Sequence, residues 1–139
     1  MFDNDNPMDR RALITALSRQ GLGAFEWDSG RGTIHVCVPL VAMFAEKPQI
    51  EVESNELRQD VELALQEAVY EAYLYIMTNS LQTPCEIGVL GAYPDGEHHF
   101  ASNNWRPVET LEEAVTRFQD LWEERDAWVR AFMNKQAPD

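Results

Sequence analysis

Histidine and cysteine side chains recur in and beside the predicted strands, and together they could ligate a metal. The set comprises His35, Cys37, Cys85, His98 and His99. A His-x-Cys pair on one strand face can chelate a soft metal, because alternate residues of a strand share a face. The spacing matches no zinc signature: Pro84-Cys85 is half of the Pro-Cys-x-x-Cys element of zinc deaminases, but position 88 is Gly and no His-x-Glu accompanies it. We therefore assign no metal ligand.

A nucleophilic pair is a second chemical alternative, with Cys85 facing His98 across a predicted hairpin. Nothing in the sequence marks this thiol as activated, and a lone cysteine is more often a packing residue. We assign no catalytic residue and no cofactor.

Carboxylates are so numerous that their pairing carries little information. Glu71 stands out because it is the only charge in the apolar run from Val69 to Met77. It could be a buried acid with a raised pKa, a residue of a solvent-facing stripe, or the partner of Arg125. We favour the pairing with Arg125.

Length and composition indicate one soluble domain. The chain has 139 residues, is 45% hydrophobic, and carries two cysteines outside any CxxC motif, which is typical of a reducing cytoplasm. No apolar run reaches the roughly 18 residues that span a bilayer, and the N-terminus lacks a secretory pattern. We expect a cytoplasmic domain over 1–139, with 1–6 and 135–139 frayed and no membrane contact.

Negative charge dominates the composition. Twenty-four acids against 11 bases give a net charge of -13, which repels phosphates and argues against direct binding to nucleic acids or anionic membranes. No Lys or Arg lies between Arg58 and Arg106, whereas seven acids do: Asp60, Glu62, Glu67, Glu71, Glu86, Asp95 and Glu97. This stretch is either a solvated surface or a face that meets a basic partner.

The first half of the chain predicts a helix and a hairpin. Asn6 and Pro7 favour a helix start, and Gly21 or Gly23 a helix end, so we expect a helix from 7 to 20. Apolar residues then alternate over 25–28 and 33–38 around a turn, which predicts two paired strands. His35 and Cys37 share one face of the second strand.

The next segment is harder to assign. Pro39 should end the pairing or lie at a sheet edge, and the apolar run from Leu40 to Ala45 fits a third strand or a helical turn. Alternation over 49–53 predicts an edge strand.

A long central helix is predicted from Asn55 to Asn79, with one face against the sheet. Its far side carries Tyr70, Leu74 and Met77, which would need a second layer or a second subunit. These three residues are the candidate dimer interface.

The last third predicts a second hairpin and a helix. Strands over 85–93 and 98–102 flank the turn residues Pro94-Asp95-Gly96. Thr110 and Glu113 match a capping box that opens a helix from Leu111 to about Asn134. Arg125 falls in the apolar stripe of this helix and requires a carboxylate or an aromatic ring beside it.

The predicted class is α+β: an antiparallel sheet from two β-hairpins packed with two long helices and one short N-terminal helix. The order is α-β-β-(β)-α-β-β-α. This order, in an acidic chain of this length, resembles the class I chaperones of type III secretion, which implies a homodimer that binds effector proteins. The size and charge are also similar to those of small acidic inhibitors of phages and mobile elements, including anti-CRISPR proteins, which block basic nucleic-acid-binding surfaces.

We expect a non-enzymatic protein that binds a basic protein partner, most concretely as an inhibitor or nucleic-acid mimic. A homodimeric chaperone and a small metal- or Cys-dependent enzyme are the alternatives. The candidate partner-binding residues are Glu51, Glu53, Glu56, Asp60, Glu62, Glu67, Trp105 and Arg106.

Overall fold

The computed structural model describes residues 9–28, 30, 33–44, 47–67, 72–81, 84–93 and 95–134, and the ends that we expect to fray lie outside them. Within these residues the chain forms four helices and one antiparallel sheet of seven strands. The predicted α+β class and the antiparallel sheet are confirmed, and the order of elements is similar to the predicted one.

Three long strands form the centre of the sheet, in the order β2-β4-β5. Two short strands pair with successive parts of β2 on one side, and two more pair with successive parts of β5 on the other. The strands are β1 Phe25–Asp28, β2 Ile34–Phe44, β3 Lys47–Ile50, β4 Tyr73–Thr78, β5 Cys85–Ala92, β6 His99–Ala101 and β7 Arg106–Val108.

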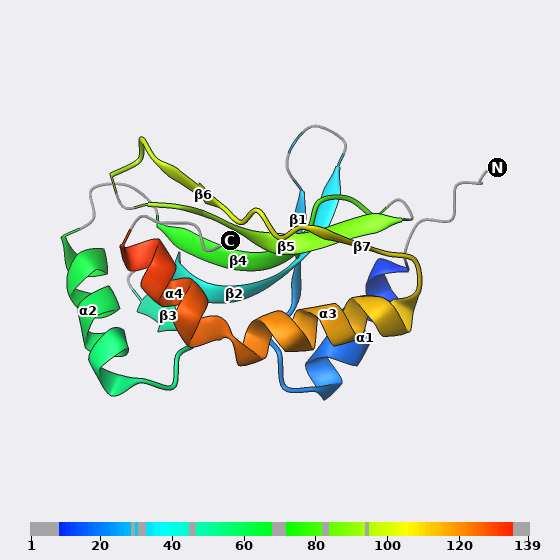
Figure 1. Ribbon diagram of the computed structural model, residues 1–139, viewed down its shortest axis with the longest axis horizontal. Helices are drawn as coiled ribbons and strands as arrows, with labels where there is room; N and C mark the ends of the chain where they lie inside the picture. Colours follow the sequence, from blue (N-terminus) through cyan, green and yellow to red (C-terminus); the bar gives the residue numbers. More distant parts are fainter. Residues whose placement is uncertain are drawn as a thin grey trace.

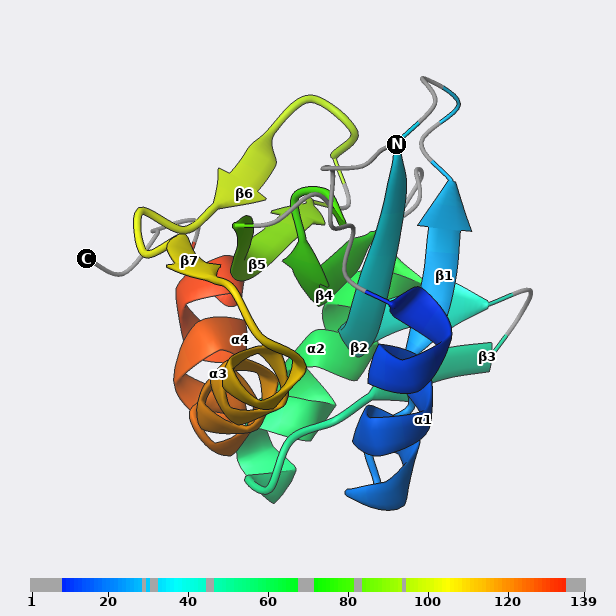
Figure 2. The ribbon, with the colours of Figure 1, turned by 90° about the vertical axis from the view of Figure 1, so that its right-hand side faces the viewer.

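The four helices lie on one side of this sheet, as both ribbon views show (Figures 1 and 2). They are α1 Arg10–Arg19, α2 Asn55–Gln66, α3 Leu111–Glu123 and α4 Arg125–Met133. The main core lies between the two layers, where Leu74 and Ile76 of β4 are fully buried with Phe118 and Phe132 of the helices. Burial of these side chains supplies most of the driving force for folding.

Both predicted hairpins are present. Phe25 opposes Cys37 in the first, and Ala92 opposes His99 in the second. Gly96 has φ 72° in the second turn, a conformation that glycine adopts without steric cost. Their alternating sequences and turn residues were sufficient to locate them.

Contrary to our expectation, Pro39 neither ends the strand pairing nor lies at a sheet edge. It lies inside β2 opposite Tyr75, and the register shifts between Pro39 and Val41. A bulge of this kind absorbs the missing N–H of a proline, so that one strand continues to Phe44. The predicted edge strand begins earlier than expected, at Lys47, and ends at Ile50.

The N-terminal helix begins later than predicted. Its N-cap is Asp9, whose side chain accepts the backbone N–H of Ala12 at 3.1 Å. The expected cap and first helical residue, Asn6 and Pro7, lie outside the described residues. The predicted C-terminal end at Gln20 is confirmed as the C-cap.

The prediction of a long central helix is wrong. Helix α2 ends at Gln66, and Tyr73–Thr78 is a central strand, while Val69, Tyr70 and Glu71 lie outside the described residues. A strand with apolar residues on both faces does not show alternation, and its continuous apolar run cannot be distinguished from a buried helix by periodicity.

The last helix is interrupted. The capping box of Thr110 and Glu113 is confirmed, with Glu113 N–H donating to Thr110 Oγ1 at 3.1 Å and Thr110 N–H to Glu113 Oε1 at 3.1 Å. The helix is interrupted at Glu124, which is both the C-cap of α3 and the N-cap of α4. The break places Arg125 and Asp126 at the start of a new helix.

Candidate protein-interaction surfaces

All six candidate partner-binding acids come from one continuous segment, residues 51–67. Glu53, Glu56, Asp60 and Glu67 are exposed, and Glu51 and Glu62 are partly exposed. The opposite face of α2 is buried through Leu57, Val61 and Leu65, whose spacing forms a helical stripe. Burial of that stripe forces the acids of α2 toward solvent.

A second stripe runs along the outer side of α2. Glu56, Asp60, Leu63 and Glu67 follow one another at steps of four, three and four residues, so they share one helix face. Leu63 is 60% exposed, and no other large hydrophobic side chain of the described residues is classed as exposed. We call these four residues the α2 stripe: a leucine flanked by carboxylates.

Arg58 does not neutralise the α2 stripe. Its guanidinium turns inward and donates to the backbone oxygens of Ile50 at 2.8 Å and Val52 at 3.1 Å. The arginine therefore ties α2 to the end of β3. Both bonds are charge-assisted, so each is stronger than a hydrogen bond between neutral groups.

The start of α4 holds the start of α2 in place. Asp126 accepts the backbone N–H groups of Glu53 and Ser54 at 2.8 and 2.9 Å. Arg125 donates to Glu53 Oε1 at 3.1 Å, and its guanidinium lies 4.7 Å from the ring centroid of Trp122. The requirement predicted for Arg125, a carboxylate or an aromatic ring, is met by both. Glu71 lies outside the described residues, so its pairing with Arg125 stays a prediction.

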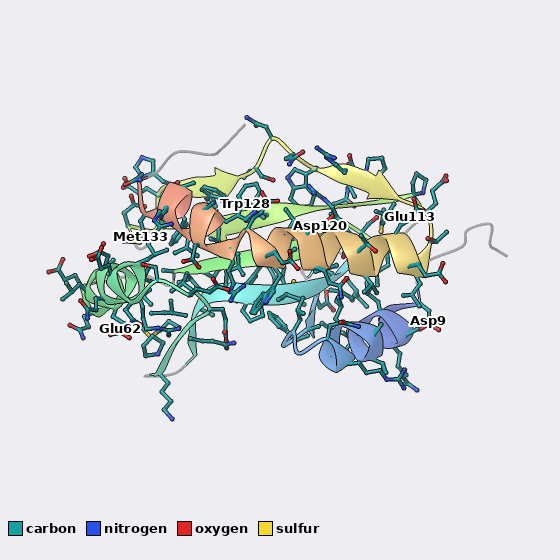
Figure 3. The ribbon with its side chains drawn as sticks, turned by 60° about the horizontal axis from the view of Figure 1, so that its bottom comes forward. Asp9, Glu62, Glu113, Asp120, Trp128 and Met133 are labelled. Carbon is teal, nitrogen blue, oxygen red and sulfur yellow. The ribbon has the colours of Figure 1, made fainter. Side chains whose placement is uncertain are left out.

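A cavity of about 220 Å³ lies where α2 meets the end of α4. Figure 3 shows Glu62 on α2 and Met133 on α4 at this end of the molecule. Arg130 contributes one cation beside two acids of α2. The lining residues are Ser54, Glu56, Leu57, Asp60, Arg130, Met133 and Asn134.

Trp105 and Arg106 do not join the acidic segment. They lie at the start of β7, on the edge of the sheet that pairs with β5, whereas α2 contacts β3 and α4 (Figure 1). The Trp105 ring covers Gly88, where an added Cβ would be 2.5 Å from Trp105 Cδ2. Arg106 donates from Nε to Asn104 Oδ1 at 3.0 Å. The structure therefore separates these two residues from the six acids.

Leu74 and Met77 are buried in β4, at 0% and 3% exposure. Tyr70, the third residue of the candidate dimer interface, lies outside the described residues. The candidate dimer interface was inferred from residues on the far side of a predicted helix. Leu74 and Met77 instead lie in strand β4, where neither reaches the surface.

The histidines and cysteines are dispersed. Cys85 begins β5 opposite Val108, whereas His99 pairs with Ala92 at the other end of that strand, about 23 Å away at 3.3 Å per residue. His98 Nδ1 lies 2.6 Å from Asp95 Oδ2. No group of three metal-ligating side chains occurs among the described residues. The alternative in which Cys85 faces His98 across the hairpin is therefore wrong, because the two residues lie at opposite ends of β5.

Burial also opposes thiolate chemistry at both cysteines. It raises the pKa of Cys37 to about 12 and raises the pKa of Cys85 above its ordinary value. A nucleophilic cysteine requires the opposite shift. Both thiols are free and buried, as expected for packing residues.

Sequence reasoning missed an aromatic cluster on the sheet face away from the helices. Phe25 and Trp27 of β1 meet Tyr75 and Tyr73 of β4, with ring centroids 5.4 and 6.4 Å apart. All four rings are partly exposed and none belongs to the main core. The available signal was the alternation of Tyr73, Tyr75 and Met77, which the helical interpretation concealed.

Comparison with protein-family models, with curated proteins and with solved structures gave no match. No helix of the described residues has the length and apolar content to cross a bilayer.

Proposed function

We propose that this protein binds a basic protein partner through the acidic segment 51–67. The observation that carries the proposal is the α2 stripe, in which Leu63, 60% exposed, lies among Glu56, Asp60 and Glu67 on one helix face. A single exposed leucine is common at protein surfaces, but this one lies among three carboxylates, so the stripe offers an apolar contact flanked by negative charge. A surface with basic side chains around an apolar pocket is complementary to this stripe.

Electrostatics supports the same partner chemistry. The net charge of -13 attracts a basic protein over long distances and accelerates its association. Arg58 is occupied by backbone carbonyls, so the outer face of α2 keeps its negative sign. The concrete version is an inhibitor that offers carboxylates in place of nucleic-acid phosphates to a basic surface in the cytoplasm.

The test begins with recovery of the partner by co-purification from the native host, followed by binding measurements with the purified partner. The triple variant Glu56→Lys, Asp60→Lys, Glu67→Lys reverses the acids of the stripe. We expect it to weaken binding at least about tenfold and to reduce the dependence on salt. Leu63→Ser should weaken binding without changing the salt dependence.

A matched control reverses three exposed acids elsewhere, Glu97→Lys, Glu109→Lys and Glu123→Lys. This set changes the net charge by the same amount, so it isolates position from total charge. Equal loss of binding in both sets would leave only a general charge effect. Binding that survives the α2 triple variant, or that ignores ionic strength, would refute the proposal.

A further inference from the structure

Helix α1 carries a basic face in a chain that is otherwise acidic. Arg11, Thr15 and Arg19 follow one another at steps of four residues, so the two arginines share one side of the helix, about 12 Å apart along its axis. Both are exposed, and neither has a hydrogen bond or an ion pair within the described residues, whereas Arg10 pairs with Glu26 at 3.3 Å. Two cations are therefore available to an outside partner.

An apolar groove lies beside this basic face. A cavity of about 400 Å³ opens where α1 packs against the start of α3, and Ala12, Ala16 and Leu111 form its apolar lining. Asp9, the acid of the lining, is occupied as the N-cap, since its Oδ1 accepts the N–H of Ala12 at 3.1 Å. We call the whole lining the α1 groove: Asp9, Arg11, Ala12, Thr15, Ala16, Arg19 and Leu111.

The α1 groove matches the α2 stripe in both charge and spacing. Leu63 lies between Asp60 and Glu67, and these two acids are about 10.5 Å apart along the helix axis. Arg11 and Arg19 are separated by nearly the same distance along α1. A leucine placed in the groove therefore brings a carboxylate toward each arginine, and guanidinium groups bind carboxylates with paired hydrogen bonds.

The two surfaces lie too far apart to meet within one chain. Figure 3 shows Asp9 and Glu113 at the end where α1 lies beside the start of α3, and Glu62 of α2 at the opposite end. A second copy can bring its α2 stripe to the groove. The net charge of -13 opposes its approach, but the Debye length is about 8 Å at physiological salt, so charges outside the contact are screened more than the pairs inside it.

We propose that a second copy of this chain is a partner of the α2 stripe, with Leu63 of one copy in the α1 groove of its neighbour. The acids on either side of Leu63 then pair with the arginines at the two ends of the groove. Exposed ion pairs contribute little individually, so the association is weak, with a Kd on the order of 0.1 mM. The inference goes beyond the proposed function, because the second copy and the basic protein then compete for one stripe.

Sedimentation equilibrium over protein concentrations around 0.1 mM tests this contact. We expect reversible self-association of the wild type and a monomer for the α1 variant, Arg11→Glu with Arg19→Glu. The triple reversal of the α2 stripe should also be monomeric. A mixture of these two variants should associate, because each supplies the surface that the other lacks. Both variants remain net negative, so overall charge attraction does not join them.

The matched control reverses two exposed bases in the sheet, Lys47→Glu and Arg106→Glu, and should self-associate like the wild type. Leu63→Ser should weaken self-association about tenfold, because it removes the apolar contact without changing the charge. Thermal unfolding of each variant checks that the fold persists.

Several outcomes would overturn the inference. These are a wild type that stays monomeric, self-association that survives either reversal, equal loss in the control, and a mixture of the two variants that does not associate. The proposed function fails on a different result, namely partner binding that survives the α2 triple variant. The α1 variant separates the two further, since it should lose self-association and still bind the basic partner.

Discussion

Asp126, at the start of α4, accepts the backbone N–H of Ser54, the N-cap of α2, at 2.9 Å. The second carboxylate oxygen accepts the neighbouring N–H of Glu53 at 2.8 Å. Two elements more than 70 residues apart in sequence are thus joined at their starting points by one side chain. The orientation of the acidic segment depends on this contact.

Removal of the Asp126 carboxylate should destabilise the protein. Asp126→Ala leaves two backbone donors without their charged acceptor, a loss of about 1–3 kcal/mol in the free energy of unfolding. Urea denaturation measures it. Glu123→Ala, an exposed acid on α3, is the matched control and should change stability little. Equal effects of the two substitutions would contradict the assigned role of Asp126.

The ion pair between Arg125 and Glu53 should contribute much less. The side chain of Glu53 is 76% exposed, so water screens the 3.1 Å contact, and we expect a coupling energy below about 1 kcal/mol. A double-mutant cycle with Glu53→Gln and Arg125→Met measures it. Arg125→Met alone should cost more than the coupling, because it also removes the contact with Trp122 and the bond to the Trp122 carbonyl. A coupling above about 2 kcal/mol would show that the pair is shielded from solvent.

Gly88→Ala should displace Trp105. The added Cβ would lie 2.5 Å from Cδ2 of the indole, closer than any tolerated contact, so the ring must leave its place on β5. We expect a loss of about 1–3 kcal/mol in stability. The emission of Trp105 should also shift to longer wavelength, measured in a variant that keeps this tryptophan alone.

Gly23→Ala is the control for that substitution, because nothing lies within 4 Å of its added Cβ and its φ is not positive. It should leave both stability and emission nearly unchanged. A stable Gly88→Ala protein with unaltered fluorescence would mean that Trp105 does not pack on β5.

Stability should fall in alkaline solution partly because of Cys37. Burial raises the pKa of its thiol from 9.0 to about 12, so the unfolded chain loses this proton first as the pH rises. The contribution of Cys37 is complete below about pH 9 and is lost progressively toward about pH 12. Cys37→Ala should therefore flatten the decline in the free energy of unfolding over this range, whatever its constant cost.

Thiol labelling provides an independent check on the cysteines. A thiol probe at neutral pH should react slowly with both Cys37 and Cys85 in the folded protein and rapidly once denaturant unfolds it. Rapid reaction of the native protein would show that a thiol is reachable. An unaltered pH profile in Cys37→Ala would show that its burial does not govern alkaline stability.

The local signals in the sequence were reliable where they act over a few residues. Alternation and turn residues located both hairpins, and Thr110 with Glu113 located the start of α3. The acids of α2 were correctly expected on a helix, where the buried stripe of Leu57, Val61 and Leu65 fixes the exposed side, whereas Glu51 and Glu53 follow β3 instead of lying on the predicted edge strand. These features depend on backbone geometry that neighbouring residues determine.

The stretch from Tyr73 to Thr78 shows where local signals fail. Its side chains are apolar on both faces, since Leu74 and Ile76 enter the main core while Tyr73 and Tyr75 join the aromatic cluster on the other side of the sheet. Neither the period of a helix nor the polar–apolar alternation of a half-buried strand is visible in such a run. Its β-favouring tyrosines and isoleucine were the remaining hint, but intrinsic β-propensity is weak.

The sequence by itself determined the class of fold, the hairpins, the capping box of α3 and the acidic character of residues 51–67, because each arises from nearby residues or from composition. Only the tertiary structure decided that β4 is a central strand, that Asp126 holds the start of α2, and that aromatic rings from β1, β2 and β4 meet on one face. Those relationships join residues separated by tens of positions. They form because packing two layers around one sheet selects a single register among several that the local signals allow.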